Sequence, residues 1–379
     1  MTIQENSSTS KHTSPASASR SRSNMLWLSA ALLVVCALTS FVAAQAPSAI
    51  EPGPEPHDIP AQWKAWIGEY GTASHGPTET VYVLSEKDGA VLLSERRDQS
   101  ENAKYELLDQ FPLSRASPRA RHKDFQLQLD SAGKRVLRIA GAEDVKITPD
   151  FAAKAQVLIK PVRPVSEIRP EALAASPPHE EGTFRKPELV ELAPLDPAIH
   201  LDIRYATSND FLGTPVYTQA RAFMQRPAAE SLVRALHKLK ALGYGLLIHD
   251  AYRPWYVTKI FWDATPPEGK IFVADPSQGS RHNRGCAVDL TLYDLASGKP
   301  IEMPGTYDEM SPRSFPDYPG GTSLERWHRD LLRRAMESEG FTVYEHEWWH
   351  FDYKDWRQYP ILNIKFEDLS SSRGLASAN

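Results

Sequence analysis

Two short polar motifs in the last quarter of the chain constrain the fold most, because their side chains suit one metal ion. His282 and Asp289 stand seven residues apart, and Glu347 and His350 follow about sixty residues later, three apart. Catalytic zinc uses about three protein ligands and keeps one position open, and hydrolysis also needs a base beside the attacking water. The inventory therefore predicts a hydrolytic zinc site, so the two segments must meet in the folded chain.

The residues around each motif indicate how the side chains reach one site. Asp289 lies in an apolar, strand-like run, where an unpaired carboxylate would be costly to bury without a metal or another partner. A turn at Gly285 can bring His282 to the same place. Glu347 and His350 follow the β-prone residues 341–344, so we expect them at a strand end or tight turn facing one pocket. Glu347 is better suited to act as a base than as a ligand.

Several further segments, taken together with these motifs, are similar to one protein family. Residues 280–289 contain Ser-x-His-x-x-Gly-x-Ala-x-Asp and residues 347–350 contain Glu-x-x-His, while residues 202–207, 250–254 and 305–310 add matching segments in the same order. The pattern resembles the M15 zinc peptidases, in particular their D-alanyl-D-alanine dipeptidase (VanX-like) branch. The resemblance extends over about half of the chain, which is enough to suggest a fold and an activity class.

The resemblance implies roles for five residues. It makes His282, Asp289 and His350 the ligands of one zinc ion per chain, and Glu347 the general base. Arg253 falls on the family arginine that stabilises the developing oxyanion, a role that suits a fixed cation facing negative charge in the transition state. A structural salt bridge or a position at a helix start is the alternative for Arg253.

Three more residues would explain a preference for short substrates. By resemblance, Ser280 binds the terminal carboxylate of the substrate, Asp308 holds its free amino group, and Tyr205 lines the pocket. A site that pairs with both ends of a dipeptide rejects longer or blocked peptides, because a buried charge would otherwise stay unpaired. For Tyr205, a position in the apolar core is an equally good interpretation.

The favoured function is zinc-dependent hydrolysis of D-alanyl-D-alanine in peptidoglycan metabolism, with a small dipeptide as the partner. An M15 D,D- or L,D-carboxypeptidase that trims peptidoglycan stem peptides is the nearest alternative, and Asp308 discriminates between them. A zinc-dependent wall-binding protein without turnover is the non-enzymatic alternative, against which Glu347 and Arg253 argue. A net charge of -5 and a pI near 6.2 give no basic surface for nucleic acid.

The fold class that we expect is α+β. Residues 191–367 should form the catalytic domain, with a central antiparallel sheet flanked by helices in a hedgehog-like arrangement, as the M15 resemblance implies. Residues 61–159 contain short apolar runs and a Lys-Asp-Gly hairpin signal, which predict a small antiparallel all-β domain. Pro-rich residues 45–60 and 160–190 suggest a spacer and a linker, and residues 368–379 a disordered tail.

The N-terminal residues 1–44 predict export to the periplasm or cell envelope. A polar segment with basic residues precedes an apolar run from Met25 that ends in Val-Ala-Ala, the order of a signal peptide with cleavage near Ala44. An uncleaved anchor is the alternative, since the apolar run is about long enough to span a bilayer. The mature protein is then expected to have no membrane segment unless the signal is retained. The N-terminal β domain could contact peptidoglycan or only stabilise the chain.

Overall fold

The computed structural model describes the following residues of the chain: 50–71, 80–97, 103–113, 118, 125–139, 145–147 and 158–369. All of them belong to one compact unit that spans residues 47–379. The expected signal peptide, residues 1–44, and most of the expected tail lie outside the described residues. Within the described part of the chain, no helix combines the length and the apolar character needed to cross a membrane.

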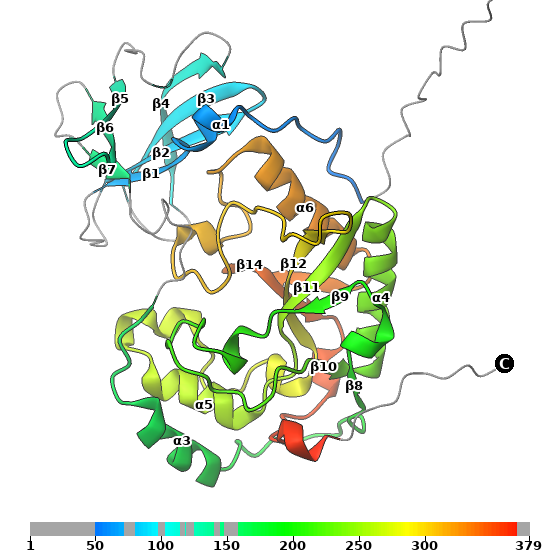
Figure 1. The fold of residues 1–379 in the computed structure, drawn as a ribbon. Coiled ribbons are helices and arrows are strands. Elements are labelled where there is room, and N and C mark those ends of the chain that lie inside the picture. The colour runs from blue at the N-terminus through cyan, green and yellow to red at the C-terminus, as the bar shows by residue number, and fades with distance from the viewer. Residues whose placement is uncertain are drawn as a thin grey trace, which may run out of the picture. The chain divides into compact units, whose positions relative to one another are not determined.

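A five-stranded sheet forms the centre of the C-terminal half (Figure 1). Its strands, in spatial order, are β13 (Phe341–Tyr344), β14 (Glu347–Tyr353), β12 (Ala287–Asp294), β11 (Tyr244–Asp250) and β9 (Ile199–Leu201). Neighbours pair antiparallel except β9 and β11, which run parallel. The sheet is therefore antiparallel, as expected, except at this edge, where α4 forms part of a crossover between β9 and β11 that returns the chain to the same end of the sheet.

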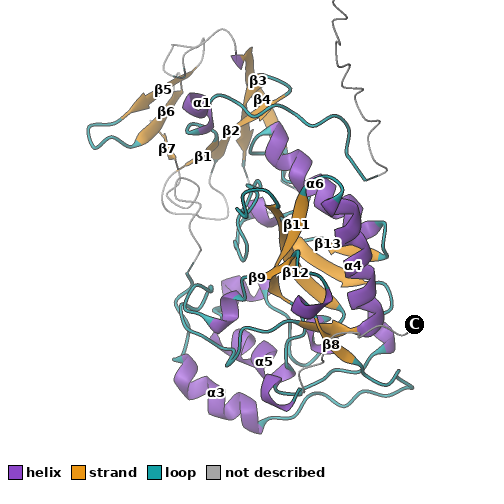
Figure 2. Cartoon of the chain, turned by 45° about the vertical axis from the view of Figure 1, so that its right-hand side comes forward, coloured by secondary structure: helices purple, strands orange, loops and turns teal. Residues whose placement is uncertain are grey.

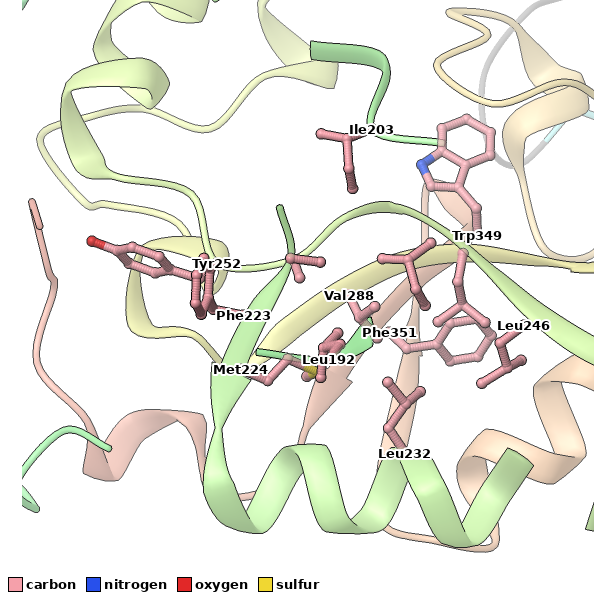
Figure 3. Packing of buried hydrophobic residues seen from close by; sticks show 14 of the residues in the cluster. Leu192, Ile203, Phe223, Met224, Leu232, Leu246, Tyr252, Val288, Trp349 and Phe351 are labelled. Carbon is pink, nitrogen blue, oxygen red and sulfur yellow. The ribbon is translucent and has the colours of Figure 1, made fainter. Parts of the chain in front are cut away.

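Two amphipathic helices cover this sheet, α4 (Arg226–Lys240) and α6 (Ser323–Glu337), and they also contact each other. Helix α6 begins with a capping box, in which Thr322 and Glu325 exchange side-chain and backbone hydrogen bonds. Figure 2 distinguishes the helices from the strands, and Figure 3 shows Leu232 of α4 pointing toward Phe351 and Leu246 of the sheet. This packing agrees with the expected arrangement of a central sheet flanked by helices.

The C-terminal half also contains a small sheet, two further helices and several 3₁₀ helices. A two-stranded sheet pairs β8 (Leu189–Glu191) with β10 (Phe223–Gln225), and α5 (Trp255–Ala264) packs against α3 (Val165–Ala174). The 3₁₀ helices are η2 (Ala193–Leu195), η3 (Arg204–Ala206), η4 (Pro267–Phe272), η5 (His282–Arg284), η6 (Pro312–Ser314), η7 (Trp356–Gln358) and η8 (Phe366–Asp368).

The segments expected to be a spacer and a linker are packed rather than extended. Residues 160–190 contain α3, whose Ile168 and Ala172 are fully buried in the main core. Pro170 lies inside this helix, so the proline content that suggested a linker was misleading. In the expected spacer 45–60, Ile50 is buried in the same core. Apolar side chains placed between the prolines therefore tie both segments to the core.

A second sheet lies in the N-terminal half, preceded by the short helix α1 (Ala61–Lys64). Its seven strands pair antiparallel throughout, and strands β1 to β6 contribute to a separate apolar cluster that includes Trp63 and Tyr70. In spatial order they are β4 (Tyr105–Pro112), β3 (Ala90–Arg96), β2 (Val81–Lys87), β1 (Gly68–Gly71), β7 (Val145–Ile147), β6 (Arg135–Ile139) and β5 (Phe125–Leu129). The β2–β3 turn at Asp88 and Gly89 has positive φ at both residues, as the hairpin signal predicts.

Candidate metal centre and its cavity

Three buried side chains converge on one point at the end of the C-terminal sheet. The Nε2 atom of His282 lies 3.1 Å from Nδ1 of His350 and 3.3 Å from Oδ1 of Asp289, and Nδ1 of His350 lies 3.0 Å from the same Oδ1. Two atoms bound about 2.0 Å from one tetrahedral ion would be roughly 3.3 Å apart. Among the described residues, this is the group of His, Cys, Asp and Glu side chains that could hold a metal ion.

Local backbone structure brings these three residues together. Asp289 of β12 and His350 of β14 are direct partners in the antiparallel register, so their side chains lie side by side. His282 begins η5, which ends at Gly285 in the left-handed conformation, with φ of 66°. The backbone N–H of Gly285 donates to the carbonyl of His282, which closes the turn. The predicted turn before the strand therefore places His282 opposite the β12–β14 pair.

Hydrogen bonds outside the triad orient the ligand atoms. Nδ1 of His282 lies 2.6 Å from the carbonyl oxygen of Ala251, and Nε2 of His350 lies 3.0 Å from Oδ1 of Asp352. With each outer nitrogen donating, the inner nitrogens present lone pairs to one point. Tyr307 donates to Oδ2 of Asp289, at 3.1 Å, whereas Oδ1 is buried with no hydrogen-bond partner among the described residues. The donor set therefore fits a divalent metal ion such as zinc.

The electrostatics of the centre favour a positive charge between the carboxylates. Burial alone would raise the pKa of Asp289, but His282 and His350 hold it well below its usual value. Burial alone would lower the pKa of His350, yet Asp352 and Asp289 raise it to about 10. Burial raises the pKa of Glu347 to about 7, although His350 opposes the shift. A carboxyl group with a pKa near 7 can both accept and donate a proton at neutral pH.

The metal centre opens into a cavity of about 490 Å³, which is large enough for a small peptide. All eight site residues predicted from the sequence line it: Tyr205, Arg253, Ser280, His282, Asp289, Asp308, Glu347 and His350. Three of them lie on strands β12 and β14, two lie on the 3₁₀ helices η3 and η5, and three lie in loops. The structure therefore brings the whole predicted set together.

Arg253 is both paired and placed in the cavity. Its Nε and one terminal nitrogen lie 2.9 and 2.8 Å from Oδ2 of Asp250, and a terminal nitrogen is 3.9 Å from Oδ2 of Asp289. Tyr217 donates to the other oxygen of Asp250, at 2.7 Å. The salt bridge that was the alternative for Arg253 thus exists, and it fixes the guanidinium beside the metal centre. Arg253 also lies over the ring of Tyr205.

Asp308 has an environment that suggests a ligand with a positive charge. Its Oδ1 accepts a hydrogen bond of 3.1 Å from Tyr205, and its Oδ2 is buried with no partner among the described residues. Burial raises the pKa of Asp308 well above its usual value, and Asp289 and Glu347 raise it further. A neighbouring ammonium group would offset this cost and restore the charged carboxylate.

Ser280 and Tyr205 each support the fold and also line the cavity. Ser280 is buried, and its Oγ accepts a hydrogen bond of 3.2 Å from the backbone N–H of His282, so it supports the ligand turn while lining the cavity. Tyr205 belongs to the main core cluster and also lines the cavity, so both of its interpretations apply.

Sequence reasoning missed the residues that hydrogen-bond to the predicted site residues and orient them, and it also missed one residue of the cavity wall. Trp349 was not among the predicted site residues, but it lines the cavity. Asp250, Asp352 and Tyr307 orient Arg253, His350 and Asp289, and none was predicted. Asp250 and Asp352 flank predicted site residues at short spacing and lie within apolar strands, so the costly burial of a carboxylate was the available signal.

Comparison with known proteins gives one consistent result. The model of the peptidase M15 family, described as D-ala-D-ala dipeptidase, matches residues 185–370. A D-alanyl-D-alanine dipeptidase of Escherichia coli is 35% identical over 179 residues, which are 47% of this chain and 91% of that protein. The Enterococcus faecalis enzyme of the same name is 36% identical over 196 residues, covering 45% and 95%. One from Streptomyces coelicolor is 35% identical over 175 residues, covering 41% and 87%.

Proposed function

The chain belongs to the M15 peptidase family of D-alanyl-D-alanine dipeptidases and is a dipeptidase, and we propose that it hydrolyses D-alanyl-D-alanine to two molecules of D-alanine. The observation that carries this substrate assignment is the position of Asp308. Its Oδ2, which has no hydrogen-bond partner in the described part of the chain, belongs to a residue that lines the same cavity as the metal centre. A dipeptide can therefore be held by its amino end while its peptide bond lies beside the metal ligands.

His282, Asp289 and His350 would hold one zinc ion per chain. The mutual distances of 3.0 to 3.3 Å support this assignment, and so does Oδ1 of Asp289, which is buried without a hydrogen-bond partner among the residues described. When bound, zinc supplies a Lewis acid that polarises a carbonyl group and makes water a better nucleophile at neutral pH. Asp352 and the Ala251 carbonyl keep both histidines in the tautomer that ligation needs.

Glu347 would move the proton. Its Oε2 lies 3.6 Å from Nδ1 of His350, so the carboxylate is next to the metal centre without belonging to the triad. It accepts a proton from the attacking water and then donates it to the amine that leaves. Burial raises the pKa of Glu347, which makes its carboxylate a stronger base than an exposed one and suits it to accept this proton.

Arg253 would stabilise the negative charge that develops on the carbonyl oxygen. Asp250 fixes the guanidinium through two contacts, so little reorganisation is needed when the charge appears. Ser280 would bind the terminal carboxylate and Asp308 the ammonium group, with Tyr205 holding Asp308 in position. These contacts select a short peptide with both ends free.

The alternatives fit these observations less well. A carboxypeptidase that trims stem peptides has no free amino group near the scissile bond, so a buried Asp308 would stay unpaired in its complexes. A wall-binding protein without turnover would not need Glu347 and Arg253 in one cavity with the metal ligands. The dipeptidase proposal uses all of these groups.

An assay with three substrates tests the proposal. Purified protein comprising residues 45–379 is incubated with D-alanyl-D-alanine, its N-acetyl form and a peptidoglycan stem pentapeptide, and released D-alanine is measured. We expect rapid hydrolysis of the free dipeptide and a loss of activity on chelation. Faster hydrolysis of the pentapeptide would favour the carboxypeptidase, and no hydrolysis of any substrate would favour the binding protein.

Export and domain organisation complete the proposal. A polar, basic segment followed by an apolar run supports cleavage near Ala44, which would place the mature protein in the periplasm or cell envelope and give it a role in peptidoglycan metabolism. The separate apolar cluster around Trp63 and Tyr70 supports an N-terminal all-β domain within residues 61–159. N-terminal sequencing of protein from a periplasmic fraction tests the cleavage site, and a start at Met1 would contradict it.

A further inference from the structure

A buried charge network joins the N-terminal sheet to the loop that holds Asp308. Glu69 of β1 and Arg313 are each about 4% exposed, and a terminal nitrogen of Arg313 lies 3.8 Å from Oε2 of Glu69. Arg313 also donates to, and forms an ion pair with, Glu309. Glu309 is the residue next to Asp308. A continuous set of charged contacts therefore runs from the sheet to the cavity.

The carboxylate of Glu309 fixes the backbone on both sides of Asp308. Its Oε2 accepts hydrogen bonds from the backbone N–H and the hydroxyl of Thr306, at 2.9 and 3.3 Å. Its Oε1 accepts one from the hydroxyl of Ser311, at 2.8 Å. Asp308 itself has a φ of 57°, in the left-handed region that residues with a Cβ seldom adopt. Such a conformation persists only where its surroundings impose it.

The other end of the network is anchored in the N-terminal sheet. Oε1 of Glu69 accepts a hydrogen bond of 3.0 Å from Tyr318, and Oε2 accepts one of 3.5 Å from Arg96 of β3. Tyr318 also packs in a small buried cluster with Val81 and Val83 of β2. Glu69 is thus held by groups on both sides, so it presents a fixed negative charge to Arg313.

The E. coli and E. faecalis relatives do not contain this N-terminal sheet. A match to fewer than half of the residues of this chain uses 91% of the E. coli protein and 95% of the E. faecalis protein, and the family model begins at residue 185. The unmatched remainder of these relatives is too short to contain a seven-stranded sheet comparable to residues 68–147. The contact between Glu69 and Arg313 therefore involves a sheet that these two relatives do not have.

We propose that the N-terminal sheet is a positioning element of the active site, in which Glu69 acts through Arg313 and Glu309 to hold Asp308 ready for the ammonium group of a short peptide. Glu69 is a positioning residue, because it contacts neither the cavity nor the metal ligands. The inference rests on the proposed function, since it assigns the ammonium group to Asp308. It gives the sheet a role in substrate selection inside the molecule.

The test compares two buried carboxylates of the same sheet. Glu69→Gln keeps the shape of the side chain and removes its charge, so we expect KM for D-alanyl-D-alanine to rise roughly tenfold while kcat changes less than threefold. Glu86→Gln is the matched control, since Glu86 of β2 is 3% exposed and accepts from the backbone N–H of Ser323, at 2.8 Å, away from the Asp308 loop. We expect its KM to match that of the wild type.

A double substitution separates positioning from a general loss of structure. In an Asp308→Ala background, Glu69→Gln should raise KM no further, because the residue through which it acts is gone. Tyr318→Phe removes one hydrogen bond to Glu69, keeps the ring, and should raise KM by a smaller factor, so it serves if Glu69→Gln folds poorly. An equal rise in KM for Glu86→Gln, or an undiminished effect in the Asp308→Ala background, overturns the inference.

A binding measurement separates failure of this inference from failure of the proposed function. Calorimetric titration of D-alanyl-D-alanine into the Glu347→Gln variant, with and without Glu69→Gln, measures the same contact without turnover. A Kd about tenfold weaker with Glu69→Gln is expected. Equal Kd values overturn the positioning role alone, whereas a wild-type protein without hydrolytic activity overturns the proposed function alone.

Discussion

The cavity sets the charge state of each carboxyl group through its neighbours. Asp289 faces two histidines, and the pKa of its carboxyl is held well below the usual value despite burial. Burial raises the pKa values of Glu347 and Asp308, that of Glu347 to about 7. Groups whose environments push their pKa values apart can take different tasks in one reaction. This difference supports a ligand role for Asp289, proton transfer by Glu347 and ammonium binding by Asp308.

The metal assignment predicts a specific loss in a His350→Ala variant. Wild-type protein should retain about one zinc ion per chain after dialysis, and the variant should retain far less, because it lacks one of three ligands. Metal content is measured by mass spectrometry. His346→Ala is the control, since His346 is a partly exposed neighbour outside the triad. Full zinc occupancy in His350→Ala would remove His350 from the site.

Glu347→Gln should keep zinc and lose turnover. The substitution leaves the triad intact but removes the proton acceptor, so kcat should fall by about two to four orders of magnitude while metal content is unchanged. Glu345→Gln is a suitable control because the Glu345 side chain is 77% exposed. Near-normal kcat in Glu347→Gln would direct attention to another carboxylate, with Glu345 the nearest alternative in sequence.

Asp308→Ala should weaken hydrolysis of the free dipeptide selectively. Loss of a buried partner for the ammonium group should cost roughly 2 to 4 kcal/mol in kcat/KM for D-alanyl-D-alanine. N-acetyl-D-alanyl-D-alanine never makes this contact, so its kcat/KM should change far less. Equal losses for both substrates would mean that Asp308 only supports the fold, and the carboxypeptidase alternative would gain.

At the scale of elements, apolar periodicity identifies strands and helices whose side chains alternate between the core and the solvent, and it misses elements without that alternation. Residues 125–129 alternate apolar and polar side chains, which is the pattern of a half-buried strand, and they form β5. Strand β1, with the sequence Gly-Glu-Tyr-Gly, was missed because it has no such alternation and is defined by its partners β2 and β7. Helix α3 was missed because its prolines suggested a linker, although Pro164 and Pro170 flank and interrupt a helix held by tertiary packing.

The candidate site was predictable only in part for a related reason. Each ligand motif is local in sequence, but the register of β12 and β14 that pairs Asp289 with His350 is a tertiary feature that was not predicted. Asp308 lies in a loop whose conformation depends on Glu309 and Arg313, and no local pattern encodes that arrangement. Resemblance alone pointed to it. Domain boundaries and contact with peptidoglycan stay predictions.

The turn that presents His282 predicts different outcomes for two glycines. Gly285 and Gly298 both have positive φ, so alanine at either should cost roughly 1 kcal/mol in stability. A Cβ at Gly285 would also lie 2.5 Å from the Leu189 side chain, whereas a Cβ at Gly298 would meet no atom within 4 Å. The Gly285→Ala variant should therefore be less stable in urea, and bind zinc more weakly, than the Gly298→Ala variant. Equal stability and equal zinc affinity would contradict this account of the turn.

At the scale of the whole molecule, the segment before the N-terminal sheet is bound to the helix that covers the C-terminal sheet. Trp327 of α6 donates to the carbonyl of Gly53, at 3.0 Å. The adjacent His328 is buried and lies 3.1 Å from the hydroxyl of Tyr244. Burial lowers the pKa of His328 to about 4, with Lys64 adding to the shift and Asp58 opposing it. A titratable group is thus enclosed between the start of the described chain and the main core.

This enclosure predicts that acid destabilises the whole molecule through His328. The unfolded chain takes up the His328 proton near pH 6.5, whereas the folded chain resists it until about pH 4, so the contribution is complete above 6.5 and is lost as the pH falls toward 4. The contribution of His328 to the free energy of unfolding should fall by roughly 3 kcal/mol over this pH range. The free energy of unfolding in urea, measured between pH 7.5 and 4.5, should fall more steeply for wild type than for His328→Gln. The difference between the two profiles isolates His328, because all other titrating groups are common to both proteins. Parallel profiles would show that His328 is already protonated in the folded state or exposed to solvent.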